Sequence, residues 1–100
     1  KGFKGCWKNE TAFRQEVIAC IVLVPLGFYL GDGGVEKALL VSVCFLVLIV
    51  EILNSAIEAV VDRISREHHE LSGLAKDLGS SAVFICLVFA GITWTLVLFF

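Results

Sequence analysis

Three carboxylates and two neutral polar side chains recur along an otherwise apolar stretch of the chain. Within Glu51-Ile-Leu-Asn-Ser-Ala-Ile-Glu-Ala-Val-Val-Asp62, the residues between the polar ones are all aliphatic or alanine. At 100° per residue, four of the five polar side chains fall within about 60° of each other on an α-helix, with Asn54 on the flank. The spacing therefore predicts a polar stripe on a greasy helix, made of Glu51, Asn54, Ser55, Glu58 and Asp62.

The residues of this stripe are expected to lie at different depths in the membrane. Glu51 lies 16 residues after Val35, or roughly 24 Å along a helix, against a hydrocarbon core of about 30 Å. Glu58 and Asp62 continue toward the headgroups and water. A carboxylate in the apolar zone costs about 3 kcal/mol, so such a residue normally faces a protein interior or a wet cavity. Carboxylate oxygens suit Mg²⁺, and one free carboxylate can accept a proton.

Two other interpretations of the stripe are weighed against this chemistry. Asn54 and Ser55 alone would fit a structural role, because small polar residues commonly bond across membrane helices. Stacked carboxylates do not fit it, since they repel each other unless they bind a cation or share protons. Intramembrane carboxylates also mark ion paths, which would make the chain a small ion or proton transporter. The confinement of the stripe to one half of the membrane speaks against a transporter.

Further polar residues approach the stripe from both flanking segments. Lys76 can neutralise phosphate as a point charge. The adjacent pair His68 and His69 has no further spaced ligands, so solvated loop or nucleotide contact is preferred over zinc. The residues on the side of the stripe are Glu10, Arg14 and Glu16 before it and Glu67, His68, His69, Glu70, Lys76 and Asp77 after it.

The composition predicts a single domain in a membrane. Of the 100 residues, 58% are hydrophobic, and the mean hydropathy is +0.91. A soluble domain this small cannot hide so much apolar surface, so lipid must cover the rest. The net charge of −2 and the lack of a basic aromatic-rich stretch speak against nucleic acid. No metal-ligand spacing links Cys6, Cys20, Cys44 and Cys86, and three of them lie in apolar runs as small hydrophobes.

Three apolar runs predict an all-α membrane protein, a bundle of three transmembrane helices. The expected spans are 12–30, 35–61 and 80–100, with a cytoplasmic loop at 62–79. Seven of the eight Lys and Arg residues then lie on one side of the membrane. By the positive-inside rule this side is cytoplasmic, as is the N-terminus, and residue 100 lies outside.

With Asn9-Glu-Thr-Ala-Phe-Arg-Gln-Glu16 before the stripe and Glu70-Leu-Ser-Gly-Leu-Ala-Lys-Asp77 after it, the chain resembles the prokaryotic integral-membrane diacylglycerol kinases. The resemblance covers nearly the whole chain. It implies a homotrimer in the bacterial inner membrane with active sites shared between subunits. The implied reaction transfers the γ-phosphate of ATP, with Mg²⁺, to diacylglycerol and gives phosphatidic acid for phospholipid synthesis. The related branch that phosphorylates undecaprenol is the alternative acceptor class.

The resemblance also implies roles for individual residues. Glu51 resembles the general base, while Asn54 and Asp62 support the site. The sequence departs from the family in one position, since Leu74 stands where the family often has Arg. The family also has an amphipathic surface helix ahead of the first span, which this sequence begins too late to show. Glu10 and Glu58 match the metal-binding carboxylates. The matching ATP-binding positions are Glu10, Glu58, Glu67, His68, His69, Lys76 and Asp77. The matching lipid-binding positions are Ala12, Phe13, Arg14, Gln15, Glu16, Glu51, Ser80 and Trp94.

Overall fold

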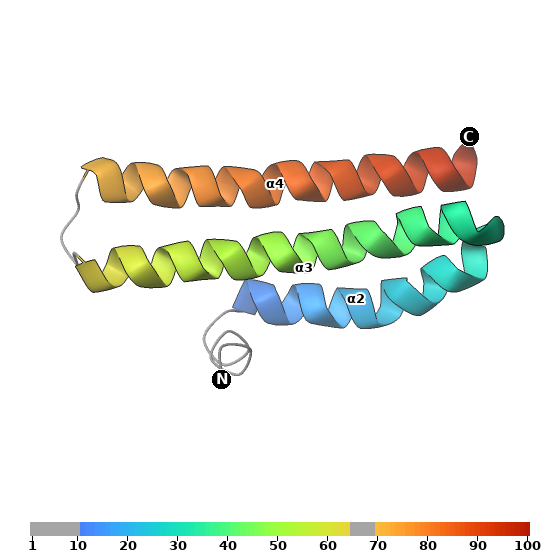
Figure 1. Cartoon of the computed structure of the whole chain (residues 1–100), viewed down its shortest axis with the longest axis horizontal. Coiled ribbons are helices and arrows are strands. Elements are labelled where there is room, and N and C mark those ends of the chain that lie inside the picture. Colours follow the sequence, from blue (N-terminus) through green and yellow to red (C-terminus); the bar gives the residue numbers. More distant parts are fainter. Residues whose placement is uncertain (1–10, 65–69) are drawn as a thin grey trace.

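The structure, a computed structural model, describes residues 11–64 and 70–100. Three long helices make up nearly all of this part of the chain. They are α2 (Thr11–Leu30), α3 (Gly33–Ile64) and α4 (Glu70–Phe99). In Figure 1, α3 lies in the middle, with α2 on one side and α4 on the other. The molecule is an elongated slab of 50 × 26 × 17 Å. The predicted all-α class is confirmed for the described residues.

The helices differ in length, and this difference shapes the molecule. All three are long and apolar enough to cross a membrane, as predicted. α2 has 20 residues, α3 has 32 and α4 has 30, which correspond to roughly 30, 48 and 45 Å. Of the three helices, only α2 is short enough to fit entirely within a hydrocarbon core of about 30 Å. The ends of α3 and α4 nearest their connection therefore extend beyond the start of α2, as Figure 1 shows.

This extension differs from the expected loop at 62–79. α3 continues to Ile64, and α4 begins at Glu70, ten residues before the expected start of the third span. Hydropathy marks the part of a helix that lipid can cover, whereas the helix itself continues as long as its backbone bonds are satisfied. Lys76 and Asp77 thus lie within a helix and not ahead of one.

A tight turn joins α2 to α3. The amide of Gly31 donates to the carbonyl of Gly27 over 3.0 Å, and Gly33 adopts a φ of +81°, which favours glycine. The amide of Asp32 donates to Oε1 of Glu36 over 2.9 Å, so a carboxylate satisfies a free amide at the start of α3, similar to a capping box. Only Gly31 and Asp32 lie between the two helices.

Two contacts fix how the outer helices lie against α3. Nε1 of Trp94 donates to the carbonyl of Leu40 over 3.1 Å, which joins α4 to α3. Sγ of Cys20 donates to the carbonyl of Cys44 over 3.4 Å, which joins α2 to α3. The α3 members of these contacts, Leu40 and Cys44, belong to a buried stripe on α3. Burial recurs there every three or four residues, as expected for one helix face. The members of this stripe are Leu40, Val43, Cys44, Val47, Glu51 and Asn54.

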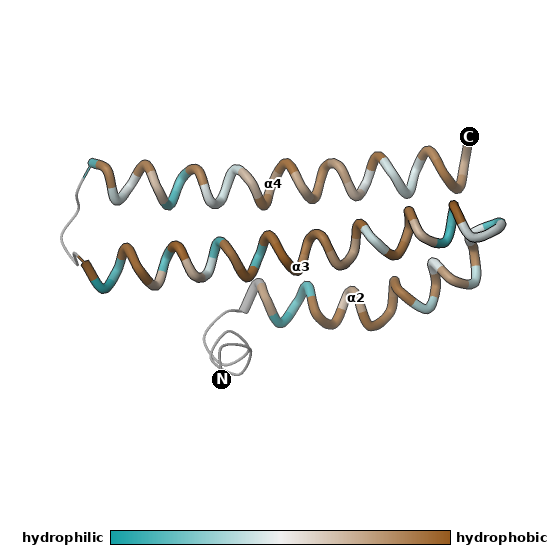
Figure 2. The backbone as a smooth tube through the Cα atoms, in the orientation of Figure 1, coloured by the Kyte–Doolittle hydropathy of each residue, from teal (hydrophilic) through white to brown (hydrophobic). Residues whose placement is uncertain are grey.

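The remaining faces of the helices are apolar and exposed. Figure 2 shows hydrophobic residues along the full length of α3 and α4, with hydrophilic ones concentrated toward their connection and at the α2–α3 turn. Such a surface is expected where lipid replaces water. Exposed examples are Ile18, Val22, Phe28, Phe45, Ile49, Phe84, Ile85 and Ile92.

Candidate functional site

Glu51 lies at the level of the first turn of α2. The antiparallel contact between Cys20 and Cys44, followed seven residues back on α2 and forward on α3, places Phe13 across from Glu51. Phe13 is fully buried, and Glu51 is only 6% exposed. The carboxylate of Glu51 is therefore enclosed by protein, as is expected of an ionisable group on an otherwise apolar helix.

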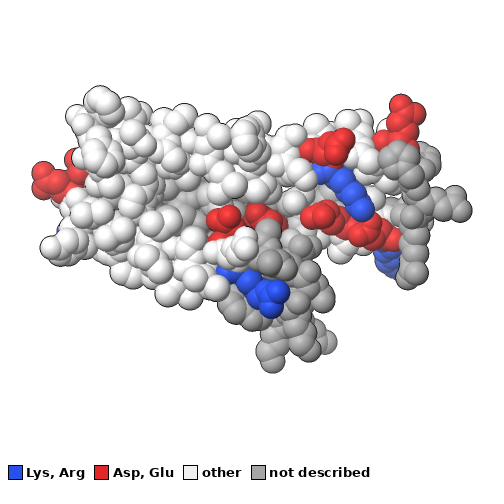
Figure 3. Space-filling model, turned by 180° about the vertical axis from the view of Figure 1, so that it is seen from behind, with Lys and Arg blue, Asp and Glu red and all other residues white. Residues whose placement is uncertain are grey.

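Beyond Glu51 the stripe becomes progressively exposed. Asn54 is 8% exposed, Glu58 is half-buried, and the side chain of Asp62 is 61% exposed. Nδ2 of Asn54 donates to Oε1 of Glu58 over 3.2 Å, one turn along the helix. Figure 3 shows charged side chains gathered on the extended end of α3 and α4 and near the start of α2. One face of α3 thus leads from the apolar zone to water.

A basic side chain from α4 meets the outer end of this stripe. Nζ of Lys76 lies 2.5 Å from Oδ1 of Asp62. Asp77 and Ser80 follow on α4, and both are exposed. The structure thus places Lys76 at the outer end of the acidic stripe, paired with its outermost carboxylate, and the predicted phosphate contact of Lys76 stays a prediction.

Gly79 on α4 packs directly against Asn54, a contact that the sequence did not predict. A Cβ added at Gly79 would clash with Oδ1 of Asn54 and would lie 3.2 Å from its Cγ. Gly79 is buried, and Oδ1 of Asn54 is buried with no hydrogen-bond partner. In the sequence, the available signal for this contact was a small residue ahead of the third span. Identifying the residue that it touches requires the register of α3 against α4.

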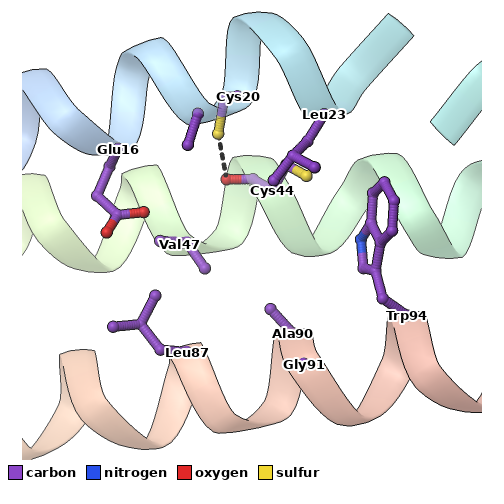
Figure 4. Close-up of a pocket in the computed structure, with 10 residues that line it drawn as sticks. Glu16, Cys20, Leu23, Cys44, Val47, Leu87, Ala90, Gly91 and Trp94 are labelled. Carbon is purple, nitrogen blue, oxygen red and sulfur yellow. Dashed lines mark hydrogen bonds between the residues drawn. The ribbon is translucent and has the colours of Figure 1, made fainter. Parts of the chain in front are cut away.

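An apolar groove of about 290 Å³ opens between α2 and α4, with α3 as its floor. Figure 4 shows Glu16 toward one end of the groove and Trp94 toward the other, with Val47 and Leu87 between them. The groove therefore has a carboxylate near the level of Glu51 and apolar walls that continue toward the α2–α3 turn. Trp94 itself is bonded to Leu40, roughly 16 Å along α3 from Glu51, so these two predicted site residues are not adjacent.

The donor set suits a hard cation only in part. Among the described residues no three His, Cys, Asp or Glu side chains gather as a metal site. Mg²⁺ does not require such a cage, since it commonly binds one or two carboxylates together with phosphate oxygens and water. Glu58 supplies one half-buried carboxylate, which is the kind of ligand that Mg²⁺ takes. Asn54 presents Nδ2 to Glu58, and its buried Oδ1 faces Gly79, so this oxygen is not aimed at the same ion.

The other predicted site residues fall into three groups. Arg14 and Gln15 are exposed on the first turns of α2, and Glu16 is half-buried. For Ala12 only its place in α2 is described. Glu10, Glu67, His68 and His69 lie outside the described residues.

The fold and the site define a class of protein: an integral membrane protein of three helices, with a carboxylate stripe that opens from the apolar zone to the aqueous end of the bundle. The family described as prokaryotic diacylglycerol kinase matches residues 1–98. Proteins named diacylglycerol kinase are similar along nearly the whole chain. The one from Haemophilus influenzae is 53% identical over 100 residues, covering 100% of this chain and 85% of the relative.

Two further relatives carry the same name. The diacylglycerol kinase of Escherichia coli strain K12 is 54% identical over 98 residues, which are 98% of this chain and 80% of the relative. That of Pseudomonas aeruginosa is 50% identical over 97 residues, which are 97% and 79% of the two chains. The chain belongs to the prokaryotic diacylglycerol kinase family. The predicted resemblance and the prediction of an ATP-dependent lipid kinase are confirmed, and the transporter alternative is not favoured.

Proposed function

We propose that the chain transfers the γ-phosphate of ATP to the hydroxyl of diacylglycerol at the membrane surface, with Glu51 as general base. One observation carries this proposal: Glu51 is buried at the level of the start of α2, and Glu58 lies farther out on the same face. Seven residues separate them, or roughly 10 Å along the helix. A site that extends over this interval can meet one substrate in lipid and the other in water.

The proposed chemistry at Glu51 is proton transfer. Its carboxylate accepts the proton of the lipid hydroxyl as the oxygen forms a bond to the γ-phosphorus, and the bond to the β-phosphate oxygen breaks to release ADP. Phosphoryl transfer depends mostly on positioning and charge neutralisation. The enclosure of Glu51 by protein supports this role, because a buried base keeps a fixed direction and bulk water does not compete for it.

The nucleotide end of the proposed site lies on the extended parts of α3 and α4. Glu58 would hold Mg²⁺ together with Glu10, and the ion would neutralise charge on the phosphates. Lys76 would contact phosphate as a point charge, and Asp77 lies next to it on α4. Family resemblance adds Glu67, His68 and His69 to this end. Supporting roles fall to Asn54, which donates to Glu58, and to Asp62, which pairs with Lys76.

The lipid end of the proposed site lies along α2 and the groove. The apolar groove between Glu16 and Trp94 suits an acyl chain, because its walls are apolar and it lies deeper in the membrane than Glu51. Exposed Arg14 and Gln15 at the start of α2 are at the level of a glycerol headgroup. The full set proposed for the lipid is Ala12, Phe13, Arg14, Gln15, Glu16, Glu51, Ser80 and Trp94.

We further propose that the chain works as a homo-oligomer, a trimer by family resemblance, with sites shared between subunits in the bacterial inner membrane. The extended end of the bundle supports an oligomer. Its apolar side chains recur at helical spacing on both helices yet remain exposed, although this part projects past the ~30 Å apolar core. They are Ile57, Val60 and Ile64 on α3 and Leu71, Leu74 and Leu78 on α4. A second copy of the chain would cover them.

One assay tests the reaction. Purified protein in mixed micelles receives γ-labelled ATP with diacylglycerol or undecaprenol, each with Mg²⁺ or with a chelator. We expect label in phosphatidic acid, little label in the undecaprenol arm and none without divalent cation. Labelled undecaprenyl phosphate alone would move the chain to the other acceptor class, and no labelled lipid in either arm would contradict a lipid kinase.

A second assay tests assembly. A cysteine introduced at Leu74, on a background without the four natural cysteines, is treated with a short bis-maleimide linker in membranes. Linked dimers are expected, because each linker joins two thiols and each subunit carries only one. A matched cysteine at Phe28, exposed on the opposite part of the bundle, controls for random collision, and equal linking at both positions would contradict the proposed interface.

A further inference from the structure

We propose that Gly79 is a positioning residue for the nucleotide end of the site, which it serves by leaving room for the Asn54 carboxamide that orients Glu58. The inference rests on the proposed function, in which Glu58 contacts the metal and nucleotide. Gly79 itself touches neither substrate in this proposal and acts through Asn54.

The contact is close and enclosed. Gly79 is one of two buried residues on α4, whose faces are otherwise exposed or partly exposed. A side chain at this position would meet Oδ1 of Asn54 first and Cγ of Asn54 next, at 3.2 Å. Cβ of Asn54 would be 3.9 Å away, an ordinary van der Waals separation. A residue larger than glycine at position 79 would therefore collide with the carboxamide of Asn54 and not with its Cβ.

The orientation of the carboxamide follows from the charge of its partner. Nδ2 of Asn54 lies 3.2 Å from Oε1 of Glu58, and an amide nitrogen donates to a carboxylate whereas an amide oxygen would be repelled by it. With Nδ2 toward Glu58, Oδ1 must face α4. There it is buried, directly against Gly79, and has no hydrogen-bond partner among the described residues.

The Asn54 carboxamide, at the end of a side chain, shifts more readily than the backbone of α4 to admit a larger residue. Lys76 is paired with Asp62 on one side of Gly79, and Trp94 is bonded to the backbone of Leu40 on the other. Both contacts join α4 to α3. A methyl group at position 79 would therefore displace the Asn54 carboxamide, and Glu58 would lose the donor that fixes its carboxylate.

The pair can be tested by a double-mutant cycle, because Asn54→Ala removes the atoms that a methyl at 79 would meet while keeping Cβ. The variants are Gly79→Ala, Asn54→Ala and the double variant, in the full chain with MgATP and diacylglycerol. We expect Gly79→Ala to raise KM for MgATP about tenfold, the effect of losing one hydrogen bond to a charged group, with KM for diacylglycerol changed less than twofold. The double variant should match Asn54→Ala.

Thermal unfolding in detergent gives a readout that does not require activity. Gly79→Ala should lower the melting temperature of the natural chain, and should raise it in the Asn54→Ala background, where alanine only improves a helix interior. Should Gly79→Ala alone fail to fold, restored folding in the double variant would support the same contact. Gly34→Ala is the matched control, because a Cβ there has nothing within 4 Å.

Two results would overturn the proposal. One is a Gly79→Ala protein with unchanged KM for MgATP, and the other is an equal effect of that substitution in both backgrounds. A failure of the proposed function looks different, since the unsubstituted protein would then label no lipid. In that case the sign reversal of the melting temperature still decides whether Gly79 positions Asn54.

Discussion

The ammonium group of Lys76 lies 2.5 Å from the carboxylate of Asp62, and this pair joins α4 to the outermost residue of the acidic stripe on α3. Both side chains are substantially exposed, at 41% and 61%. An ion pair in that setting contributes little to stability. The pair instead identifies a cation beside the nucleotide end of the proposed site, where incoming phosphate can take over from Asp62.

The two partners are therefore expected to respond differently to substitution. Lys76→Ala removes a phosphate contact and should raise KM for MgATP about tenfold or more. Asp62→Asn frees the ammonium group while leaving it in place, so KM for MgATP should change less than about threefold. Steady-state kinetics in mixed micelles with ATP varied at saturating diacylglycerol measure both. Equal and large losses from the two substitutions would mean that the pair itself, and not the lysine, supports activity.

Glu51→Gln tests the proposed general base. The amide fills the same volume but cannot accept the proton of the lipid hydroxyl, so kcat should fall by about 10²–10⁴-fold. Binding of nucleotide, measured by calorimetry with a non-hydrolysable ATP analogue and Mg²⁺, should stay nearly unchanged. Glu36→Gln provides the matched control at the other end of α3, where the carboxylate accepts from the amide of Asp32. Turnover of Glu51→Gln at the level of that control would remove Glu51 as the base.

The sequence predicted the stripe well, because helical periodicity alone places Glu51, Asn54 and Glu58 on one side of α3. It could not predict the start of α4 at Glu70, since hydropathy reports where lipid covers a helix and not where the helix begins. Nor could it identify Gly79 as the neighbour of Asn54. That contact depends on the register between α3 and α4. The register is set by contacts that lie away from the polar stripe, such as the bond from Trp94 to Leu40.

Trp94→Phe tests one of the contacts that set this register. The substitution keeps an aromatic ring but removes the Nε1 donor to the carbonyl of Leu40, a bond of 3.1 Å between α4 and α3. The loss should lower stability by about 1 kcal/mol, measured as the SDS mole fraction at which helicity is half lost. At low temperature and saturating diacylglycerol, kcat should fall less than about threefold, because the site residues of the polar stripe lie more than two helical turns away. A stability equal to that of the unsubstituted chain would mean that the indole bond does not hold the helices together.

Gly27 controls the approach of α2 to α3. A Cβ at this position would lie 3.2 Å from Cβ of Leu40 and 3.3 Å from Cγ2 of Val41, and Leu40 is fully buried. Gly27→Leu must push the helices apart or distort the buried stripe, at a cost of about 1–3 kcal/mol for overpacking. Gly34→Leu is the matched control, since nothing lies within 4 Å of a Cβ there. We expect thermal inactivation in detergent to be faster for Gly27→Leu only. Because α2 also carries Phe13 and Glu16 on its face toward the site, loosening it should raise KM for diacylglycerol more than KM for MgATP. An equal rise in both constants would indicate that α2 does not form the lipid end of the site.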